Sequence, residues 1–183
     1  MRRKSNYICN EEGTTAVEFA LVGGIFVLSL IFVMGAALVV FINQTIDNAT
    51  IRASRKILTG GLQSQSTAAT LESFKKSLCG YLPTTISCDD IIVNLYVVPR
   101  AMQPSGYYAY VAPDMSGVTV ANLSTGTGQF DLGGRGDYQY LQVVYPITFL
   151  PQQVSSWLSG GATYKGKPAY LAVSAAAFRN EQY

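Results

Sequence analysis

The stretch that decides the fold is Gly13-Thr-Thr-Ala-Val-Glu-Phe19, because it opens the long apolar run of the chain. From Phe19 to Ile42 the sequence contains no charged residue. A helix over these residues, at about 1.5 Å per residue, would be about 36 Å long, which exceeds the ~30 Å hydrocarbon core of a bilayer. The sequence therefore predicts a transmembrane helix close to the N-terminus.

Charged residues mark the start of this helix. The basic segment Arg2-Arg3-Lys4 precedes it, so the positive-inside rule predicts a cytoplasmic N-terminus and a chain that lies outside from about Asn43 onward. Glu18 lies at the edge of the apolar run, five residues after Gly13. A carboxylate beside hydrocarbon is costly, which makes Glu18 a candidate functional residue with a partner elsewhere.

Three other kinds of N-terminal segment fit this pattern less well. A cleaved secretory signal has an apolar core of about 7–15 residues followed by its cut site, whereas this run is far longer. A lipoprotein signal has its cysteine after the apolar core, but Cys9 precedes it. An uncut signal anchor accounts for the basic flank and the apolar length, but not for Glu18 or its spacing from Gly13.

A basic leader, a glycine, a glutamate five residues later and a membrane-length helix together resemble type IV prepilins and pseudopilins. In that class a prepilin peptidase cuts directly after the glycine, and the glutamate neutralises the new α-amino group of a neighbouring subunit during assembly. The resemblance implies cleavage between Gly13 and Thr14, removal of a leader over residues 1–13, and assembly roles for Glu18 and Phe19.

The closer resemblance is to TadE-like minor pseudopilins of the tight-adherence (Tad, or Flp) pilus. It rests on the N-terminal box Gly-Thr-Thr-Ala-Val-Glu-Phe-Ala-Leu, on Cys79-Gly-Tyr-Leu-Pro leading to Cys88, and on Ala-Phe-Arg179-Asn180-Glu181 near the C-terminus. Gln182 stands where this family is expected to have proline. The implied partners are the prepilin peptidase, the major pilin, other minor pseudopilins, the inner-membrane assembly platform and membrane lipid.

Small residues recur on one side of the apolar helix. Ala16, Ala20 and Gly24 are spaced four residues apart, and small residues at this spacing let two membrane helices approach closely. The pattern indicates lateral packing against a neighbouring subunit, although glycine and alanine are frequent in membrane helices in general.

Composition argues against several functions. The chain of 183 residues contains no histidine, which removes the commonest general base and most zinc sites. We therefore expect no enzyme activity, no metal and no cofactor. A formal net charge of +2 without clustered Lys and Arg gives no nucleic-acid-binding surface.

Cysteine usage indicates an exported domain. Cys79 and Cys88 lie nine residues apart beyond the apolar run, and in an oxidising compartment two such cysteines are expected to pair. Two buried free thiols are the alternative.

Beyond Ile42 the pattern stays helical as far as Gly60-Gly61, which predicts a transmembrane and extended helix over residues 14–59 and an outer domain over residues 60–183. In that domain we expect a short second helix ending near Gly80, and a helical turn around Trp157 in an otherwise irregular stretch. Alternating apolar residues predict an antiparallel sheet of three or four strands, and hence an α+β fold. The strand candidates are Ile91 to Val98, Tyr107 to Ala112, Val118 to Leu123, Tyr138 to Tyr145 (closed by Pro146) and Tyr170 to Ala177.

The sequence thus predicts a single-pass inner-membrane protein with a periplasmic domain, which is processed by prepilin peptidase and takes part in assembly or initiation of a Tad pilus used in surface attachment. The alternatives are a pseudopilin of another type II secretion or type IV pilus-like machine, and an uncut, signal-anchored periplasmic binding protein.

Overall fold

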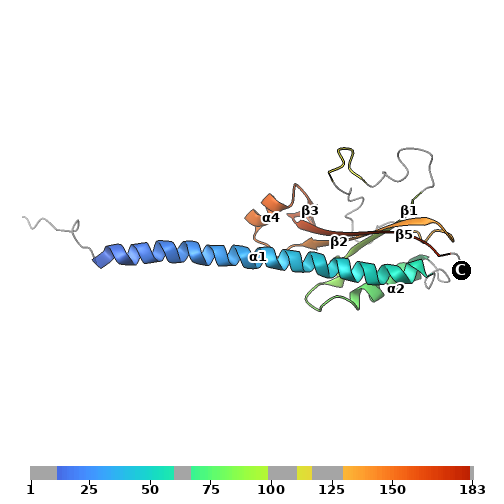
Figure 1. Cartoon of the computed structure of the whole chain (residues 1–183), viewed down its shortest axis with the longest axis horizontal. Coiled ribbons are helices and arrows are strands. Elements are labelled where there is room, and N and C mark those ends of the chain that lie inside the picture. Colours follow the sequence, from blue (N-terminus) through green and yellow to red (C-terminus); the bar gives the residue numbers. More distant parts are fainter. Residues whose placement is uncertain (1–11, 60–66, 99–110, 117–129, 182–183) are drawn as a thin grey trace, which may run out of the picture. The chain divides into compact units, whose positions relative to one another are not determined.

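The computed structural model describes residues 12–59, 67–98, 111–116 and 130–181. Helices come first and strands dominate the remainder, which confirms the predicted α+β class (Figure 1). The elements in chain order are α1 (Glu12–Leu58), α2 (Thr67–Cys79), the 3-10 turn η2 (Cys88–Asp90), β1 (Ile92–Val98), β2 (Tyr138–Ile147), α4 (Gln152–Leu158), β3 (Thr163–Tyr164), β4 (Lys167–Pro168) and β5 (Tyr170–Arg179).

The chain forms two compact units, Met1–Val40 and Phe41–Tyr183, and the division falls inside α1. In the first unit every described residue belongs to α1. The second unit contains the last part of α1, from Phe41 to Leu58, together with all the strands and the other helices. The long helix was predicted over residues 14–59, whereas the cut that would release residues 1–13 stays a prediction.

The main sheet has the strand order β1-β2-β5, and both pairs are antiparallel. In the register of β1 with β2, Ile92 lies opposite Val144 and Val98 opposite Tyr138. Three of the predicted strands are thereby confirmed. The other two candidates fall almost wholly on residues 99–110 and 117–129, which lie outside the described residues.

Strand β2 does not end at Pro146, as the sequence predicted, but continues to Ile147, and Pro146 lies opposite Leu171 of β5. Pairing with β1 stops at Val144, so Pro146 has a strand neighbour on one side only. A proline has no N–H to donate and is tolerated where a strand lacks a partner. Proline was therefore a poor stop signal at this position.

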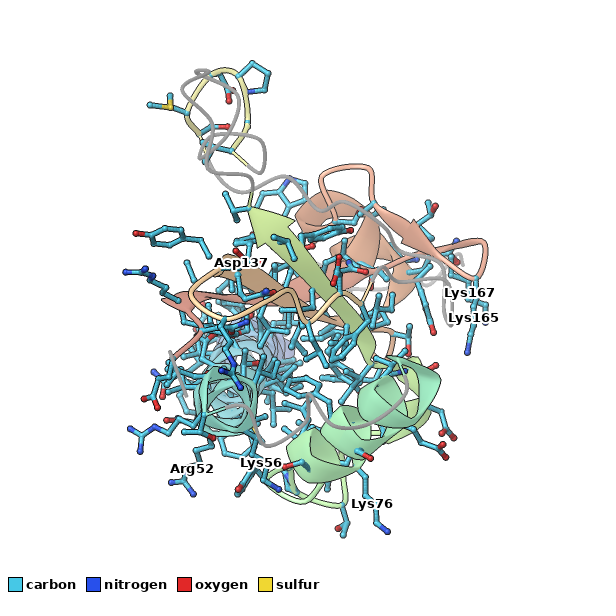
Figure 2. All side chains as sticks on the ribbon, turned by 90° about the vertical axis from the view of Figure 1, so that its right-hand side faces the viewer. Arg52, Lys56, Lys76, Asp137, Lys165 and Lys167 are labelled. Atoms are coloured by element: carbon cyan, nitrogen blue, oxygen red, sulfur yellow. A yellow bond between two sulfur atoms is a disulfide. The ribbon has the colours of Figure 1, made fainter. Side chains whose placement is uncertain are left out.

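The core of the second unit lies between the sheet and the helices α1 and α2, which lie beside each other along one face of the sheet (Figures 1 and 2). Phe74 of α2 is fully buried, and its ring centroid lies 5.7 Å from that of Phe130. Phe130 in turn bridges to Leu95 of β1. The buried apolar residues of α1 recur every three or four positions, as expected for a helix packed on one side: Ile42, Ile46, Ala49, Ala53 and Ile57.

A two-stranded hairpin, formed by β3 and β4, packs close to one end of the main sheet. Tyr164 and Ala169 are buried against Ile92 and Val144. The central turn residues Lys165 and Gly166 both have positive φ, as the tight two-residue hairpin turn requires. The helical turn that was expected around Trp157 is α4, which precedes this hairpin.

Candidate functional site

The apolar part of α1 has the properties of a membrane-crossing helix. It is long and apolar enough to span a bilayer, and almost none of it is buried within the protein. A core helix of a soluble protein would hide such a stretch, so burial inside this chain does not explain it. The helix is suited to a single-pass membrane anchor.

Several of the residues that the sequence singled out lie on the exposed surface of this helix. Thr14, Glu18 and Phe19 are all exposed, and Phe19 has 81% of its surface accessible. Gly13 and Thr14, which flank the predicted cut, both lie within α1. Among the residues that the structure describes, no ion pair involves Glu18. An exposed carboxylate at the edge of an apolar helix can accept a cationic group from another chain.

The small-residue positions face away from Glu18. Ala16, Ala20 and Gly24 follow one another along one side of α1, and a methyl group added at Gly24 would meet nothing within 4 Å. An α-helix turns by about 100° per residue, so Glu18 lies about 160° around the helix from Ala20, the middle of the three. Glu18 and the small residues are adjacent in sequence, but they can serve two different neighbours.

The predicted disulfide is confirmed. Cys79 and Cys88 are bonded, with their Cα atoms 6.0 Å apart. The bond joins the last residue of α2 to the first residue of η2, immediately before β1. It therefore ties the end of α2 to the sheet on which that helix packs.

The C-terminal residues fasten the last strand to two other parts of the domain. The Asn180 side-chain amide donates hydrogen bonds to the carbonyl oxygens of Leu132 (2.9 Å) and Gly134 (3.0 Å). Its backbone N–H donates to the carbonyl of Asp137, the residue that Figure 2 labels beside this turn, at 2.9 Å. Asn180 is buried and thereby fixes the glycine-containing turn before β2.

The residues on either side of Asn180 extend this attachment. Arg179 donates from Nε to the carbonyl of Gly136 at 3.0 Å, and its guanidinium lies 5.6 Å from the ring centre of Tyr138. The backbone N–H of Glu181 donates to the carbonyl of Leu58, the last residue of α1, at 3.1 Å. The tripeptide Arg179-Asn180-Glu181 therefore joins β5, the turn and the end of α1. Its sequence alone gave no sign of these partners, because all of them are distant along the chain.

A second polar attachment holds the β3–β4 hairpin. Asp90 accepts hydrogen bonds from the Tyr164 hydroxyl (2.9 Å) and from Lys165 Nζ (2.8 Å). The hydrogen bond from Lys165 lowers the pKa of Asp90 below its usual value, and the bond from Tyr164 adds a smaller effect in the same direction. In the described part of the chain no group of three or more His, Cys, Asp or Glu side chains is arranged to hold a metal ion.

Comparison with known proteins agrees with the N-terminal features. The family model described as TadE-like protein matches residues 13–55, a stretch that begins at Gly13 and contains Glu18 and the whole apolar run. Searches of the curated proteins and of the solved structures each found no match. Residues 13–55 of this chain are thus similar to TadE-like proteins, and this similarity supports an association with the Tad pilus machinery.

Proposed function

We propose that this chain is a minor pseudopilin, which prepilin peptidase cuts between Gly13 and Thr14 and which then takes part in assembling or initiating a tight-adherence pilus. The carboxylate of Glu18 would pair with the new α-amino group of a neighbouring subunit. The side of the helix formed by Ala16, Ala20 and Gly24 would pack against a second neighbour.

The observation that carries this proposal is the exposure of the matched segment. Residues 14–40 of α1 present large apolar side chains to the outside, and one exposed carboxylate lies near their start. In water such a surface would associate, because an exposed apolar area of this extent is unusual for a monomeric soluble protein. A bilayer before assembly, and neighbouring helices after it, would cover the same surface.

The implied partners follow from this role. The uncut chain would meet the prepilin peptidase in the inner membrane, with its N-terminus in the cytoplasm and its C-terminal domain in the periplasm. The cut chain would then meet the assembly platform, the major pilin and other minor pseudopilins. No chemistry on a substrate is proposed for it, and no cofactor or metal.

The first test is the mass and N-terminal sequence of the full chain, expressed with and without its cognate prepilin peptidase. We expect a new terminus at Thr14 only when the peptidase is present. A Gly13→Leu variant should stay uncut, whereas Gly23→Leu, placed where added atoms meet no neighbour within 4 Å, should be cut normally. A chain that still begins at Met1 in peptidase-active cells would instead support an uncut anchor with a periplasmic binding domain.

The second test concerns Glu18. We expect Glu18→Ala to be cut at Thr14 but to lower the number of pili per cell, because the new amino group would lose its counter-charge in an apolar environment. Asp47→Ala removes an exposed acid beyond the apolar run of the same helix and serves as the matched control. Equal pilus numbers for wild type and Glu18→Ala would show that this carboxylate has no part in assembly.

A further inference from the structure

Helix α4 carries its apolar residues on the outside. Val154, Trp157 and Leu158 are spaced at i, i+3 and i+4, so they share one side of the helix, and all three are exposed. Trp157 has 80% of its surface accessible, whereas Ser155, on the inward side, is buried and its hydroxyl bonds to the carbonyl of Leu150. A helix packed on a soluble domain normally has the opposite distribution.

Phe149, three residues before α4, is also an exposed apolar residue. Single exposed apolar residues are common on proteins, but four within ten residues form a patch that indicates a binding surface. We call Phe149, Val154, Trp157 and Leu158 the α4 patch. Its position in the domain indicates what it binds.

The α4 patch lies at the end of the domain where the apolar run stops. The bond from Glu181 to Leu58 fixes the C-terminal end of β5 at the C-terminal end of α1. From there β5 extends back to Tyr170 over about 30 Å, and α1 extends back to Phe41 over about 26 Å. The two elements run alongside each other, and α4 lies at the end of the sheet away from the C-terminus (Figure 1).

The end of the sheet at which α4 lies is therefore level with Phe41 and Ile42, the last residues of the uncharged run. When α1 spans a bilayer, the membrane surface lies near Phe41 and Ile42, because the uncharged run ends there. Tryptophan is the side chain most typical of that region, because its ring is apolar and its N–H can still reach water or headgroups.

Two lysines lie on the hairpin that α4 contacts. Helix α4 contacts β4, and Lys165 and Lys167 project together from the β3–β4 hairpin (Figure 2). Both are exposed, and Lys165 is held by Asp90 at 2.8 Å. Basic residues next to an exposed apolar helix face are the combination that binds anionic lipid surfaces.

We propose that α4 is a membrane-surface helix: the α4 patch inserts at the boundary between headgroups and acyl chains of the outer leaflet, and Lys167 faces anionic headgroups. The bilayer would thereby orient the outer domain through a second attachment besides α1. The proposal requires α1 to be inserted in a membrane, but neither cleavage at Gly13 nor pilus assembly.

The chain provides its own reporter for this contact, because Trp157 is its single tryptophan. The full, uncut chain would be reconstituted into vesicles of mixed phosphatidylcholine and phosphatidylglycerol, and Trp157 emission would be measured with lipids brominated at defined depths. We expect stronger quenching by bromines near the headgroup end of the acyl chains than by bromines near the chain ends, and weak quenching by aqueous acrylamide. Vesicles without bromine give the reference emission.

Three results separate the possible occupants of the patch. Quenching by brominated lipid that stays constant as protein is diluted into more lipid supports the proposal. Strong acrylamide quenching with no bromine effect would mean that the patch stays in water, and would overturn it. Protection from acrylamide that disappears on dilution, again without a bromine effect, would identify another protein subunit as the occupant and would equally overturn it.

Variants that keep Trp157 test the individual contacts. Leu158→Ser should reduce quenching by shallow bromines, whereas Ile51→Ser, an exposed apolar residue on α1, should not. Lys167→Glu should reduce quenching in anionic vesicles more than in purely zwitterionic ones, and Lys76→Glu on α2 is the matched charge control (Figure 2). If Lys167→Glu has no effect in anionic vesicles, the proposed contact of that lysine with headgroups is wrong. Because the peptidase is absent, these results do not depend on whether the chain is a pseudopilin.

Discussion

The two parts of α1 form one continuous helix but have different surroundings. Up to Val40 the described side chains are almost all exposed, including large apolar ones such as Ile31, which has 62% of its surface accessible. From Ile42 onward one side of the same helix is buried; Ile46, for example, is 1% exposed. Little of the first part is buried within this protein, whereas the sheet covers one side of the second part.

This difference shows that helicity and burial are set independently along α1. The first part is apolar all round, which suits lipid or neighbouring helices, and its backbone hydrogen bonds are satisfied internally. The second part is apolar on one side only, and its buried positions include small residues such as Ala49 and Ala53. Small side chains let the sheet lie close to the helix, so this part is specified by packing rather than by hydrophobicity alone.

The sharpest test of this comparison is the same substitution in each part. Ile46→Ala removes buried atoms next to the sheet and should lower the free energy of unfolding of the outer domain by about 2–5 kcal/mol. Ile31→Ala should leave it nearly unchanged, because Ile31 is 62% exposed and the substitution removes little buried surface. Urea unfolding of the full chain in detergent micelles, followed by near-ultraviolet circular dichroism, measures both. Equal losses would contradict the division of α1 into a packed and an unpacked part.

The disulfide should stabilise only the outer domain. Replacing both Cys79 and Cys88 by serine opens a loop of roughly ten residues, for which the chain-entropy model gives a loss of about 2.7 kcal/mol. The same unfolding experiment measures this loss, and added reductant should reproduce it in the wild type. Cys9→Ser is the matched control, since Cys9 is not part of this bond. Membrane insertion should be the same for the wild type, the double serine variant and Cys9→Ser.

The C-terminal attachment should be weaker but measurable. Asn180→Ala leaves two carbonyl oxygens, those of Leu132 and Gly134, without this donor and should cost about 1–3 kcal/mol of outer-domain stability. Hydrogen exchange should rise in the turn before β2 and at the end of α1. Asn48→Ala removes only an exposed bond within one helical turn and should change neither readout. Unchanged exchange in Asn180→Ala would rule out an attachment through this side chain.

The smallest effect is expected at Asp90. Its pKa is lower in the folded protein than in the unfolded chain, so the ionised carboxylate stabilises the fold. This contribution is fully present above the ordinary Asp pKa of 3.8 and is lost as the pH falls through the lower folded value. Asp90→Asn should therefore increase hydrogen exchange in the β3–β4 hairpin at neutral pH but not in strong acid. Asp89→Asn, at the exposed neighbouring acid, is the control; an equal increase there would argue against a specific role for Asp90.

Much of the fold could be read from local patterns. The length of the apolar run predicted the N-terminal helix, Gly60-Gly61 marked its end to within a few residues, and alternating apolar residues located β1, most of β2 and β5. These features depend on periodicities of a few residues, which a sequence displays directly. The end of β2 was wrong because the effect of Pro146 depends on where the neighbouring strand stops, and that is a property of the sheet.

The candidate site, like the fold, could be predicted from the sequence only in part. Gly13 and Glu18 were singled out through the resemblance to prepilins, and the small residues through their spacing. The stretch with the TadE-like match contains all of them, and their roles stay predictions. The partners of Asn180 and Asp90 were not found, because they lie 43 to 75 residues away along the chain. Nor could spacing show that the apolar residues of α4 face outward, since three such residues in a short helix usually face a core.

The sequence by itself determined the membrane-length helix, the position of its carboxylate, the α+β class and the pair of cysteines, because each of these follows from composition or from spacing along a short segment. Only the tertiary structure decided which side of α1 the sheet covers, where the C-terminal residues attach and that α4 exposes Trp157. These features depend on which distant segments meet when the outer domain closes around its core, and no local periodicity contains that information.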